Sequence, residues 1–566
     1  SYRHFAALSV AVYCACSEAA TPPEQREPAS PQGPDAKAWN PGVPGDVGMS
    51  WDAAPTRAFP ALPEVVVQPP VPALADCAAV FVGPTGLCQP RASMCQPFEA
   101  AVPTLGCVDL QESVEATALP DDTVDVYPEH ELALGAGPSL GDAVAIAPSG
   151  ATLRLRPGTH AGDIRIDKLL RMVGSGVRDT VVGGLEIGPS GTLELSDVSV
   201  EAFSTGLLVD GGKLVATRVR LHSVAGAGVQ ADHGADVVVR RAAIVECGLN
   251  GALALEASLL LEECSLDRNT VGVVAAAGAT VQLRNVAVEG GEVAGVHALE
   301  GFGGPWELDR VAVVATDGGL FLPGHVVVAD LVVSGGARVV FGTGDVLRAR
   351  LDFARAGSTA PTGEFSFGSG SLTDVDASGG RDGSVEPSGL RIGGHVKAVR
   401  LRVGGGIGDG LSLQDGVSLD GVDIDVFGMA AGATGAPVAG GHVRPGAVAS
   451  LRRSRIAHVA GMGARTFGIG ARLSLEDVAI GPIDPPSSRA FGVGVASLPG
   501  SEVTLRRVVI EKTQLAAIWV HRGSVDARDV WIVDVSEGEV VDAEKGLLTG
   551  IADGILAVLP RALALD

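Results

Sequence analysis

The feature that most constrains the fold is a motif that recurs along the chain after residue 150. Each copy has an apolar residue, two polar residues and then apolar-x-apolar, as in Leu195, Val198 and Val200. Alternation with a period of two predicts a strand with one buried face, and the two polar residues predict a bend between two short strands. Gly-rich turns and a second apolar segment, such as 206–211 or 492–497, complete each unit. Four copies of the motif read TLELSDVSV (192–200), ATVQLRNVAV (279–288), RLSLEDVAI (472–480) and SEVTLRRVVI (501–510).

Residues equivalent to Leu195, which we use as a marker, recur in most cases every 20 to 26 residues, near the repeat length of solenoid proteins. We place the later markers at Ala216, Val239, Leu261, Leu283, Leu308, Val328, Arg348, Leu372, Ala398, Leu419, Leu451, Leu475, Leu505 and Ala527. A unit this short has no core of its own and must stack in register on its neighbours. Leucine-rich repeats have a similar period, but no Asn recurs here at a fixed place. We therefore predict an all-β protein, a parallel β-helix of roughly 16 coils.

The polar residue two places after each marker provides a second test of stacking. Equivalent residues of successive coils lie about 4.8 Å apart, and in the later repeats their charge alternates in sign, with Gly421 as the one interruption. The alternating residues are Arg310, Asp330, Arg350, Asp374, Arg400, Arg453, Asp477, Arg507 and Asp529. Opposite charges stacked in this way stabilise by about 0.2 to 1 kcal/mol each. We interpret them as a structural charge ladder that fixes the register, rather than as a catalytic row.

Residues 1–16 are similar to a bacterial export signal. Arg3 and His4 precede the apolar run FAALSVAVYCAC, which is too short to span a bilayer and typical of a signal peptide. Cys16, preceded by the small Ala15, resembles the lipid-attachment site of a bacterial lipoprotein; the alternative is an ordinary secretory signal. We therefore expect an exported protein, an outer-membrane or cell-surface lipoprotein, or otherwise a periplasmic or secreted one.

The next two segments, 17–76 and 77–138, lack the apolar repeat. Residues 17–76 are rich in Pro, Gly and Ala, which predicts a disordered linker. Segment 77–138 contains four close cysteines, Cys77, Cys88, Cys95 and Cys107. After an export signal they predict two disulfides of unknown connectivity, rather than a zinc site, because no C-x2-C pair or His cluster is nearby. Cys264 occupies the inward place of Val198 and Cys247 lies in a turn, so we expect no disulfide between these two.

Residues 139–176, SLGDAVAIAPSGATLRLRPGTHAGDIRIDKLLRMVGSG, resemble the opening segment of right-handed parallel β-helix proteins of the pectin-lyase-like superfamily. In that superfamily a short amphipathic element, here 140–144, caps the open end. A turn, here Pro157-Gly158-Thr159, then leads into the first strand pair, and Gly174-Ser175-Gly176 makes a later corner. The resemblance implies a right-handed parallel β-helix over 139–566. The superfamily includes lyases, hydrolases, esterases, epimerases and adhesins, so the fold alone does not select a function.

Composition and charge exclude several partners. The net charge of -24 argues against nucleic acid, because phosphate binding requires clustered Lys and Arg. It also argues against a polyanionic substrate, unless a local basic patch or bridging cations are present, and against membrane contact other than through a lipid anchor. We expect no cofactor and no metal, with calcium at clustered aspartates as the one alternative.

No catalytic set of the superfamily's hydrolases, which need paired carboxylates, is found in the chain, and we name no catalytic residue. The candidate ligand-binding residues are Trp531, at an outward strand position, Trp519 and His521 in the stretch AIWVHRG, and Asp423 with Asp425 on one outward strand face. Exposed aromatic rings stack on sugars, and two carboxylates can hold a cation. The alternatives are that Trp519 covers the end of the core and that the aspartates form a solvated face.

Histidines follow a glycine at His325, His395 and His442. We interpret them as residues of the turns at which coils begin, and because His325 and His395 are three coils apart we expect no ligand role. Two longer insertions, 428–446 and 482–492, add loops to the same half of the chain as the candidate binding residues. Loops commonly carry the functional site of a rigid scaffold.

Together these features predict a non-catalytic, exported β-helix scaffold that binds carbohydrate or cell-surface ligands. The alternative is an enzyme, a polysaccharide lyase or glycoside hydrolase that acts on a surface or extracellular glycan. The last residues, ALALD (562–566), match the beginning of another coil, with Leu563 and Leu565 aligned to Leu193 and Leu195. Because a solenoid needs a terminal cap and an open strand edge pairs readily, we expect further sequence or a partner to cover this end.

Overall fold

The computed structural model describes residues 64–83, 86–111, 120, 123–133, 135–276, 278–299, 304–314, 316, 318–335, 338–353, 364–379, 388–431, 437–485, 492–536, 538–542, 546–551, 553–558 and 562–565. The predicted export signal with Cys16, and most of the predicted linker, lie outside these residues. Among the residues described, no helix is long and apolar enough to cross a membrane.

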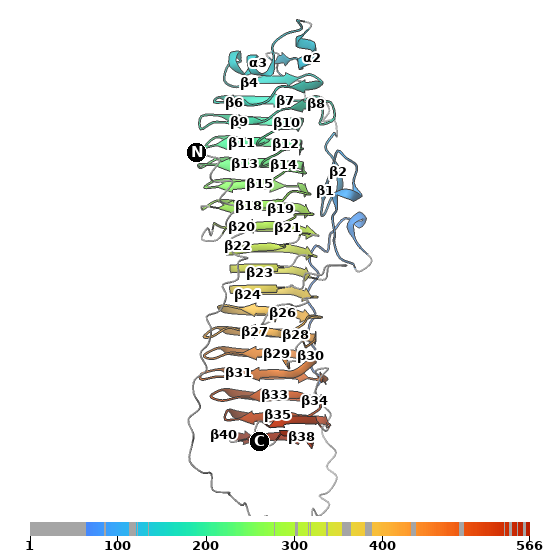
Figure 1. The fold of residues 1–566 in the computed structure, drawn as a ribbon, viewed down its shortest axis with the longest axis vertical. Coiled ribbons are helices and arrows are strands. Elements are labelled where there is room, and N and C mark those ends of the chain that lie inside the picture. Colours follow the sequence, from blue (N-terminus) through green and yellow to red (C-terminus); the bar gives the residue numbers. More distant parts are fainter. Residues whose placement is uncertain are drawn as a thin grey trace, which may run out of the picture. The chain divides into compact units, whose positions relative to one another are not determined.

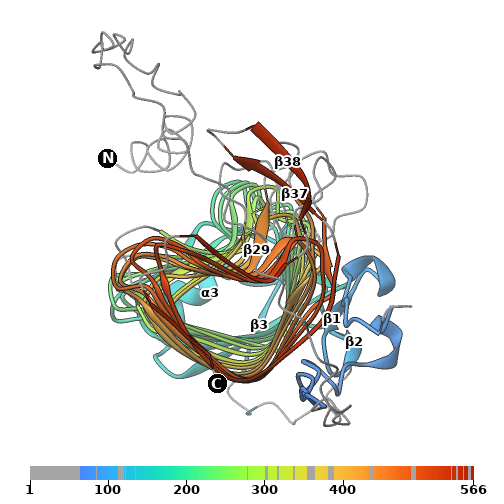
Figure 2. The same cartoon turned by 90° about the horizontal axis from the view of Figure 1, so that it is seen from below.

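Short strands stack in parallel from β3 (Val124–Val126) to β40 (Ala562–Leu565), which confirms the predicted parallel β-helix (Figure 1). Each coil contributes to three faces (Figure 2). In each coil a short strand follows the glycine-rich turn, and these strands together form sheet 1. The next strand is longer and bends in its middle; its first half belongs to sheet 2 and its second half to sheet 3. Apolar side chains alternate inward on all three and form one continuous core.

The strands of sheet 1 are β6 (Ile164–Ile166), β9 (Leu185–Ile187), β11 (Leu207–Asp210), β13 (Val229–Asp232), β15 (Asn250–Leu255), β18 (Val271–Ala276), β20 (Ala294–Ala298), β25 (Ser388–Ile392), β27 (Asp409–Leu413), β29 (Val438–Val443), β33 (Val493–Ser497), β35 (Ala516–His521) and β39 (Asp553–Val558). The strands that pass from sheet 2 into sheet 3 are β10 (Thr192–Val200), β12 (Lys213–His222), β14 (Asp236–Val245), β19 (Thr280–Glu289), β21 (Trp306–Val314), β26 (His395–Gly404), β28 (Ser418–Met429), β31 (Arg472–Ile480), β34 (Glu502–Thr513) and β36 (Ser524–Val535). Strands that cross all three sheets are β22 (Leu320–Ser334), β23 (Arg338–Asp352), β24 (Glu364–Ser378) and β30 (Val448–Thr466).

The remaining strands of the coils are shorter. Sheet 2 also contains β3, β4 (Ala151–Leu155), β7 (Leu169–Val173), β16 (Ser258–Glu262) and β40. Sheet 3 also contains β5 (Gly158–His160), β8 (Thr180–Val182) and β17 (Ser265–Asp267), and β32 (Ile483–Asp484) pairs with β30. Outside the coils, β37 (Gly538–Asp542) and β38 (Gly546–Ile551) form an antiparallel hairpin.

The bend between sheets 2 and 3 is made by one residue in the left-handed conformation, as the two polar residues of the motif predicted. Such a φ disfavours most side chains, yet few glycines or asparagines are used. The bend residues have φ between 48° and 76° and are Asp197, Arg218, Arg241, Glu263, Asn285, Arg310, Asp330, Arg348, Asp374, Arg400, Asp423, Arg453, Asp477, Arg507 and Asp529. The charge ladder therefore lies at the bend itself.

The prediction that Arg350 belongs to the charge ladder is wrong. Val346 lies opposite Val328 in the pairing of β22 with β23, so the marker of this coil is Val346 and the ladder residue is Arg348. Arg350 lies two residues further along, on the outer face of sheet 3. A shift of two residues leaves every side chain on its predicted face, so the alternation in the sequence does not distinguish the two alignments.

The same shift removes the one interruption of the ladder. Gly421, rather than Leu419, lies opposite Ala398, so the ladder residue of this coil is Asp423 and not Gly421. The sign of the charge then alternates without a break from Arg310 to Asp529.

Ion pairs connect ladder residues of successive coils, and in five places an arginine bonds the aspartate of the coil before it. Both aspartate oxygens accept a hydrogen bond from the guanidinium, a geometry that is stronger than a single contact. The pairs are Asp197–Arg218, Asp330–Arg348, Asp374–Arg400, Asp423–Arg453 and Asp477–Arg507.

A short helix closes the first coil, at the place where the resemblance predicted a cap. Helix α3 (Leu140–Ile146) begins after Ser139, whose hydroxyl accepts a hydrogen bond from the backbone of Asp142, and such a cap satisfies a free helix N–H. Leu140, Ala143 and Val144 are buried against the end of the core. Helix α2 (Glu129–Leu132) precedes it.

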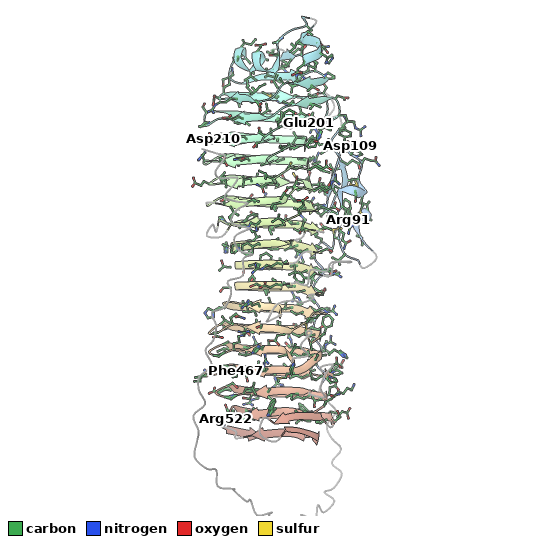
Figure 3. All side chains as sticks on the ribbon, in the orientation of Figure 1. Arg91, Asp109, Glu201, Asp210, Phe467 and Arg522 are labelled. Atoms are coloured by element: carbon green, nitrogen blue, oxygen red, sulfur yellow. A yellow bond between two sulfur atoms is a disulfide. The ribbon has the colours of Figure 1, made fainter. Side chains whose placement is uncertain are left out.

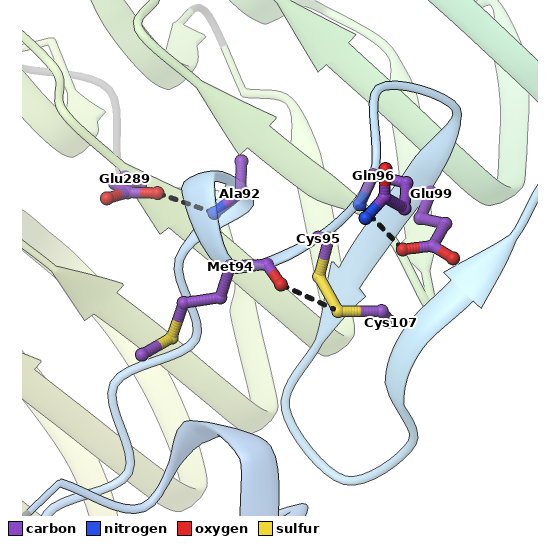
Figure 4. Close-up of a disulfide and its surroundings, with 7 residues drawn as sticks. All are labelled: Ala92, Met94, Cys95, Gln96, Glu99, Cys107 and Glu289. Atoms are coloured by element: carbon purple, nitrogen blue, oxygen red, sulfur yellow. Dashed lines mark hydrogen bonds between the residues drawn. A yellow bond between two sulfur atoms is a disulfide. The ribbon is translucent and has the colours of Figure 1, made fainter.

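The four close cysteines form the disulfides Cys77–Cys88 and Cys95–Cys107. Cys247 and Cys264 are free and buried, which confirms that they do not pair with each other. The N-terminal segment (64–111) has short 3-10 helices at Ala79–Phe81 and Ala92–Met94 and the antiparallel strands β1 (Glu99–Val102) and β2 (Gly106–Asp109). Figure 4 shows the second disulfide and its surroundings beside the coils.

At the other end, β40 pairs in parallel with β36, and Leu563 and Leu565 lie opposite Val525 and Ala527. This is the register that the alignment of ALALD predicted. Figure 3 shows two opposite edges of the stack: Asp210 and Arg522 lie where sheet 1 turns toward sheet 2, and Glu201 lies at the far end of sheet 3.

Candidate functional site

The outer face of sheet 1 carries one column of side chains with chemistry suited to catalysis. The inward residues of these strands, such as Leu411, Val443 and Val495, are buried in the core, so the residues between them point outward. In strict register along the stack, the outward column reads Arg391, Ser412, His442, Arg465, Ala496 and Trp519. Successive members are about 4.8 Å apart along the axis.

His442 is the centre of a half-buried polar cluster. Its Nδ1 lies 2.8 Å from Oδ2 of Asp409 and 2.9 Å from Nη2 of Arg465. Arg465 Nη2 and Asp409 Oδ2 are 3.6 Å apart. The side chains of Asp409, His442 and Arg465 are 15%, 12% and 24% exposed, so water screens their charges only in part.

The position of Asp409 follows from the coil geometry. Asp409 begins β27, one coil before His442, and its Oδ1 accepts a hydrogen bond of 2.7 Å from the backbone N–H of Ala439. This bond fixes the carboxylate beside Nδ1 of His442. A carboxylate next to Nδ1 favours the tautomer in which Nδ1 carries the proton, and Nε2 is then the basic nitrogen. In that tautomer Nδ1 donates to Asp409 and accepts nothing from Arg465, since a guanidinium only donates, so Arg465 is held by its charge attraction to Asp409.

Trp519 lies two coils beyond Arg465 on the same column, with Ala496 between them. Its ring is partly buried and packs against an apolar cluster outside the main core, which is formed by Ala439, Met462, Val493, Ala496, Leu515 and Ala516. Ala439 also donates its backbone N–H to Asp409, so this residue contacts both the polar cluster and the apolar cluster beneath the indole. The ring centroid of His521 is 6.5 Å from that of Trp519, so the structure brings these two predicted residues together.

The other predicted binding residues lie elsewhere. Trp531 lies opposite Val509 on the sheet 3 half of β36, on a different face from Trp519. Asp423 is the ladder partner of Arg453. Asp425 is on the outer face of sheet 3, where both its oxygens accept hydrogen bonds of 2.9 Å from Arg455.

Metal ligands are sparse among the residues that the structure describes. The one group of three candidate ligands close enough to share an ion is Cys95, Glu99 and Cys107. Both cysteines are in a disulfide and offer no thiolate. Asp423 and Asp425, the predicted calcium ligands, are each engaged by an arginine.

His442 was missed as a site residue because it was grouped with His325 and His395. Those two lie opposite Thr343 and Ser418 at the start of sheet 2, as expected of residues where coils begin. His442 instead lies within a strand of sheet 1. The insertion at 428–446 lengthens this coil, so the sequence spacing from Asp409 to His442 is 33 residues and does not match the repeat.

No family model matches the sequence, and no curated protein matches it. Among solved structures, the chain is similar to the catalytic unit of the thermostable GH87 alpha-1,3-glucanase from Streptomyces thermodiastaticus strain HF3-3, with 13% identity, a TM-score of 0.31 and coverage of 68% of this chain and 67% of that chain. It is also similar to a mutant of the PL6 family alginate lyase AlyGC (11% identity, TM-score 0.23, 73% of this chain and 81% of that chain). A third is the A-module of the Azotobacter vinelandii mannuronan C-5 epimerase AlgE4 (12% identity, TM-score 0.17, 75% and 93%).

These similarities concern the fold, and they agree with the predicted resemblance to right-handed parallel β-helix proteins. They also contradict the prediction of a non-catalytic scaffold, because the proteins named are a glucanase, a lyase and an epimerase. We correct that prediction, and its alternative, an enzyme that acts on a glycan, is taken up below as a proposal.

Proposed function

We propose that the protein is a polysaccharide lyase that cleaves an acidic extracellular glycan on the outer face of sheet 1. The observation that carries the proposal is the cluster of His442 with Asp409 and Arg465 on an outward column of that sheet. A glycoside hydrolase needs two carboxyl groups on either side of the bond it cleaves. The six residues of the column include no carboxylate, and Asp409, the carboxylate beside them, is already bonded to the His442 imidazole and to the Ala439 N–H, so these residues suit elimination better than hydrolysis.

The elimination assigns one role to each member of the cluster. Nε2 of His442 accepts the proton from the carbon next to the sugar carboxylate, the electron pair of that C–H bond forms a C=C bond, and the glycosidic C–O bond breaks. The leaving oxygen takes a proton from water. The guanidinium of Arg465 stabilises the negative charge that builds up on the sugar carboxylate, and Asp409 holds the imidazole in the tautomer in which Nε2 is basic.

A local positive charge supports an acidic substrate despite the net charge of -24. Arg391 and Arg465 occupy the same outward column three coils apart, and Arg391 donates a hydrogen bond of 3.1 Å to Gln414. Cationic residues on one face raise the local concentration of a polyanion. These two arginines are the positive charges that support an acidic substrate on this sheet.

Trp519 supplies a carbohydrate-binding surface beside the cluster. An indole that packs on an apolar cluster and is only partly buried can stack on a sugar ring, and such stacking combines apolar burial with the weak attraction of C–H groups to the ring. Ala496, between Arg465 and Trp519 in the column, is buried in the apolar cluster against which the indole packs. We assign Trp519 and His521 to binding rather than to the bond-breaking step.

The test is a lyase assay on a panel of uronate polymers, with and without calcium, in which the unsaturated product is followed by its ultraviolet absorbance. His442→Ala should lower kcat/KM by about 100-fold or more, the usual contribution of a general base. His395→Ala is the matched control, because it removes an exposed imidazole on sheet 2 that bonds to Ser418, and it should keep full activity. Equal activity of the two variants, or reducing ends without unsaturation, would reject the lyase.

A second variant pair separates binding from chemistry. Trp519→Ala should raise KM roughly threefold to tenfold with little change in kcat, the size of a lost aromatic contact. Trp531→Ala removes the other outward tryptophan and should leave KM unchanged. A fall in kcat alone in Trp519→Ala would contradict the binding role.

We also propose that the protein is exported and anchored through Cys16. Two disulfides in one short segment support an oxidising compartment outside the cytoplasm, where a polymeric glycan is accessible. Cys16→Ser in a chain that carries the whole export signal should abolish incorporation of labelled fatty acid while the lyase activity persists. Equal labelling of the variant would refute the anchor.

A further inference from the structure

The size and charge of the side chains on the outer face of sheet 3 change along the stack. In strict register, its outward column reads Arg220, Ala243, Ser265, Ala287, Ala312, Val332, Arg350, Asp376, Arg402, Asp425 and Arg455. After Arg220, small residues fill the column from Ala243 to Val332, and alternating charges fill it from Arg350 onward. Although they point outward, Ala287 and Ala312 are only 2% and 0% exposed, so another part of the protein covers them.

The cover is the N-terminal segment (64–111). One apolar cluster joins Leu74, Leu87 and Cys88 of the segment to Ala312, Val314 and Val332 of the coils. A second cluster joins Ala100, Val102 and Leu110 to Val177 and Ala243. Small outward residues are found where the segment packs, because a larger side chain there would hold the two surfaces apart.

Polar contacts fix the segment along the stack. Three backbone N–H groups and one side chain of the segment donate to side chains on three strands, β19, β22 and β24. The bonds are Thr104 to Asn285 Oδ1 (3.1 Å), Ala92 to Glu289 Oε2 (2.7 Å; Figure 4) and Val71 to Asp374 Oδ1 (2.9 Å), and the side chain of Gln89 donates to Ser334 Oγ (3.1 Å). Burial raises the pKa of Glu289, as expected beneath a cover.

The order of these contacts shows the path of the segment. Val71 meets Asp374 on β24, whereas Phe98 lies between the guanidinium groups of Arg178 and Arg220, with its ring centre 4.9 and 5.2 Å from their Cζ atoms. The segment therefore runs back along the stack, from β24 to the turn before β8. It contacts coils that do not touch one another.

We infer that residues 64–111 act as a strap that holds the coils from β8 to β24 together, so that these coils open only when the strap is released. In a bare solenoid each coil contacts only its neighbours and can open separately. A segment that grips many coils at once couples their opening. The two disulfides keep the strap compact, since they cross-link positions on either side of its contact residues.

The experiment is native-state hydrogen exchange with mass spectrometry on the full chain. Phe98→Ala removes the aromatic anchor, and Ala312→Glu places a charge under the strap from the side of the coils. Both variants should raise amide exchange about tenfold or more in peptides of β12, β14, β19, β21 and β22. Peptides of β31 and β34, which the strap does not reach, should exchange as in the unaltered protein.

Phe203→Ala is the matched control, because Phe203 is a fully exposed phenylalanine that follows β10, and it should change nothing. Mild reduction of the unaltered protein is a second measurement that needs no mutation, and it should raise exchange in the same peptides. Exchange that rises evenly over all coils, or that stays unchanged in the covered ones after either treatment, would overturn the inference. Neither result bears on the lyase proposal, whose residues are on sheet 1.

Discussion

The charge ladder leads to a prediction that depends on burial rather than on sequence. The side chain of Asp423 is 1% exposed, and its oxygens accept bonds of 3.2 and 2.8 Å from Arg453. Arg453→Gln leaves this carboxylate buried without its cation. Breaking a buried pair costs about 3 to 5 kcal/mol. Because Arg453 itself is 55% exposed and water reaches one side of the pair, we expect the lower end, about 3 kcal/mol.

The matched variant is Arg507→Gln. Arg507 makes the same type of contact with Asp477, but the two side chains are 47% and 41% exposed. Pairs this exposed contribute little, since water already screens both charges. The backbone φ is 48° at Arg453 and 52° at Arg507, so any strain of the left-handed conformation is the same in both variants and cancels. We expect no resolvable loss of stability for Arg507→Gln.

A rescue variant tests the cause. Adding Asp423→Asn to Arg453→Gln removes the stranded charge, and Asn tolerates the left-handed conformation well, so most of the lost stability should return. Urea unfolding followed by circular dichroism measures the three variants, and hydrogen exchange in peptides of β28 and β30 locates the effect. Equal losses for the two arginine variants, or no recovery in the double variant, would refute the reasoning.

Three further predictions follow. Gly440→Ala should lower the melting temperature, because a Cβ there would lie 2.3 Å from Cγ2 of Ile456 and overpacking costs about 1 to 3 kcal/mol; an unchanged melting temperature would contradict this. Burial raises the pKa of Cys247 and of Cys264 to about 12, so iodoacetamide at neutral pH should alkylate them, as seen by mass spectrometry, only after unfolding. The hydrogen bond from Arg400 lowers the pKa of Asp374. The contact therefore stabilises the folded protein fully above the ordinary carboxyl pKa of about 3.9, and this stabilisation is lost as pH falls through the lowered pKa. Urea unfolding at several pH values measures this, and a free energy of unfolding that rises on acidification in that range would contradict the prediction.

Most of the coil could be predicted from the sequence because strand alternation is local. Leu195, Val198 and Val200 alternate with polar residues, and this decides which side chains point inward without knowledge of the rest of the fold. The inward place of Cys264 and the pairing of β40 with β36 followed from the same pattern. The mistaken ladder position Arg350 shows its limit, since a slip of two residues preserves every inward and outward assignment.

The candidate site required more than the pattern. Trp519 and His521 were predicted because large aromatic residues are rare in this chain, where aromatics are 4% of the sequence. His442 was overlooked, because its importance depends on Asp409 and Arg465, which come from the coils before and after it.

The sequence by itself determined that the chain folds into stacked parallel coils, which side chains enter the core, and that charges alternate at the bends. These properties depend on a period of two and on the motif that repeats it. Only the tertiary structure decided which coils bring His442 to Asp409, and that Val71 reaches Asp374, 303 residues away. The physical reason is that contacts between coils depend on the lengths of turns and insertions, which vary from coil to coil. Docking of the strap depends in addition on the match of two surfaces, which no local pattern encodes.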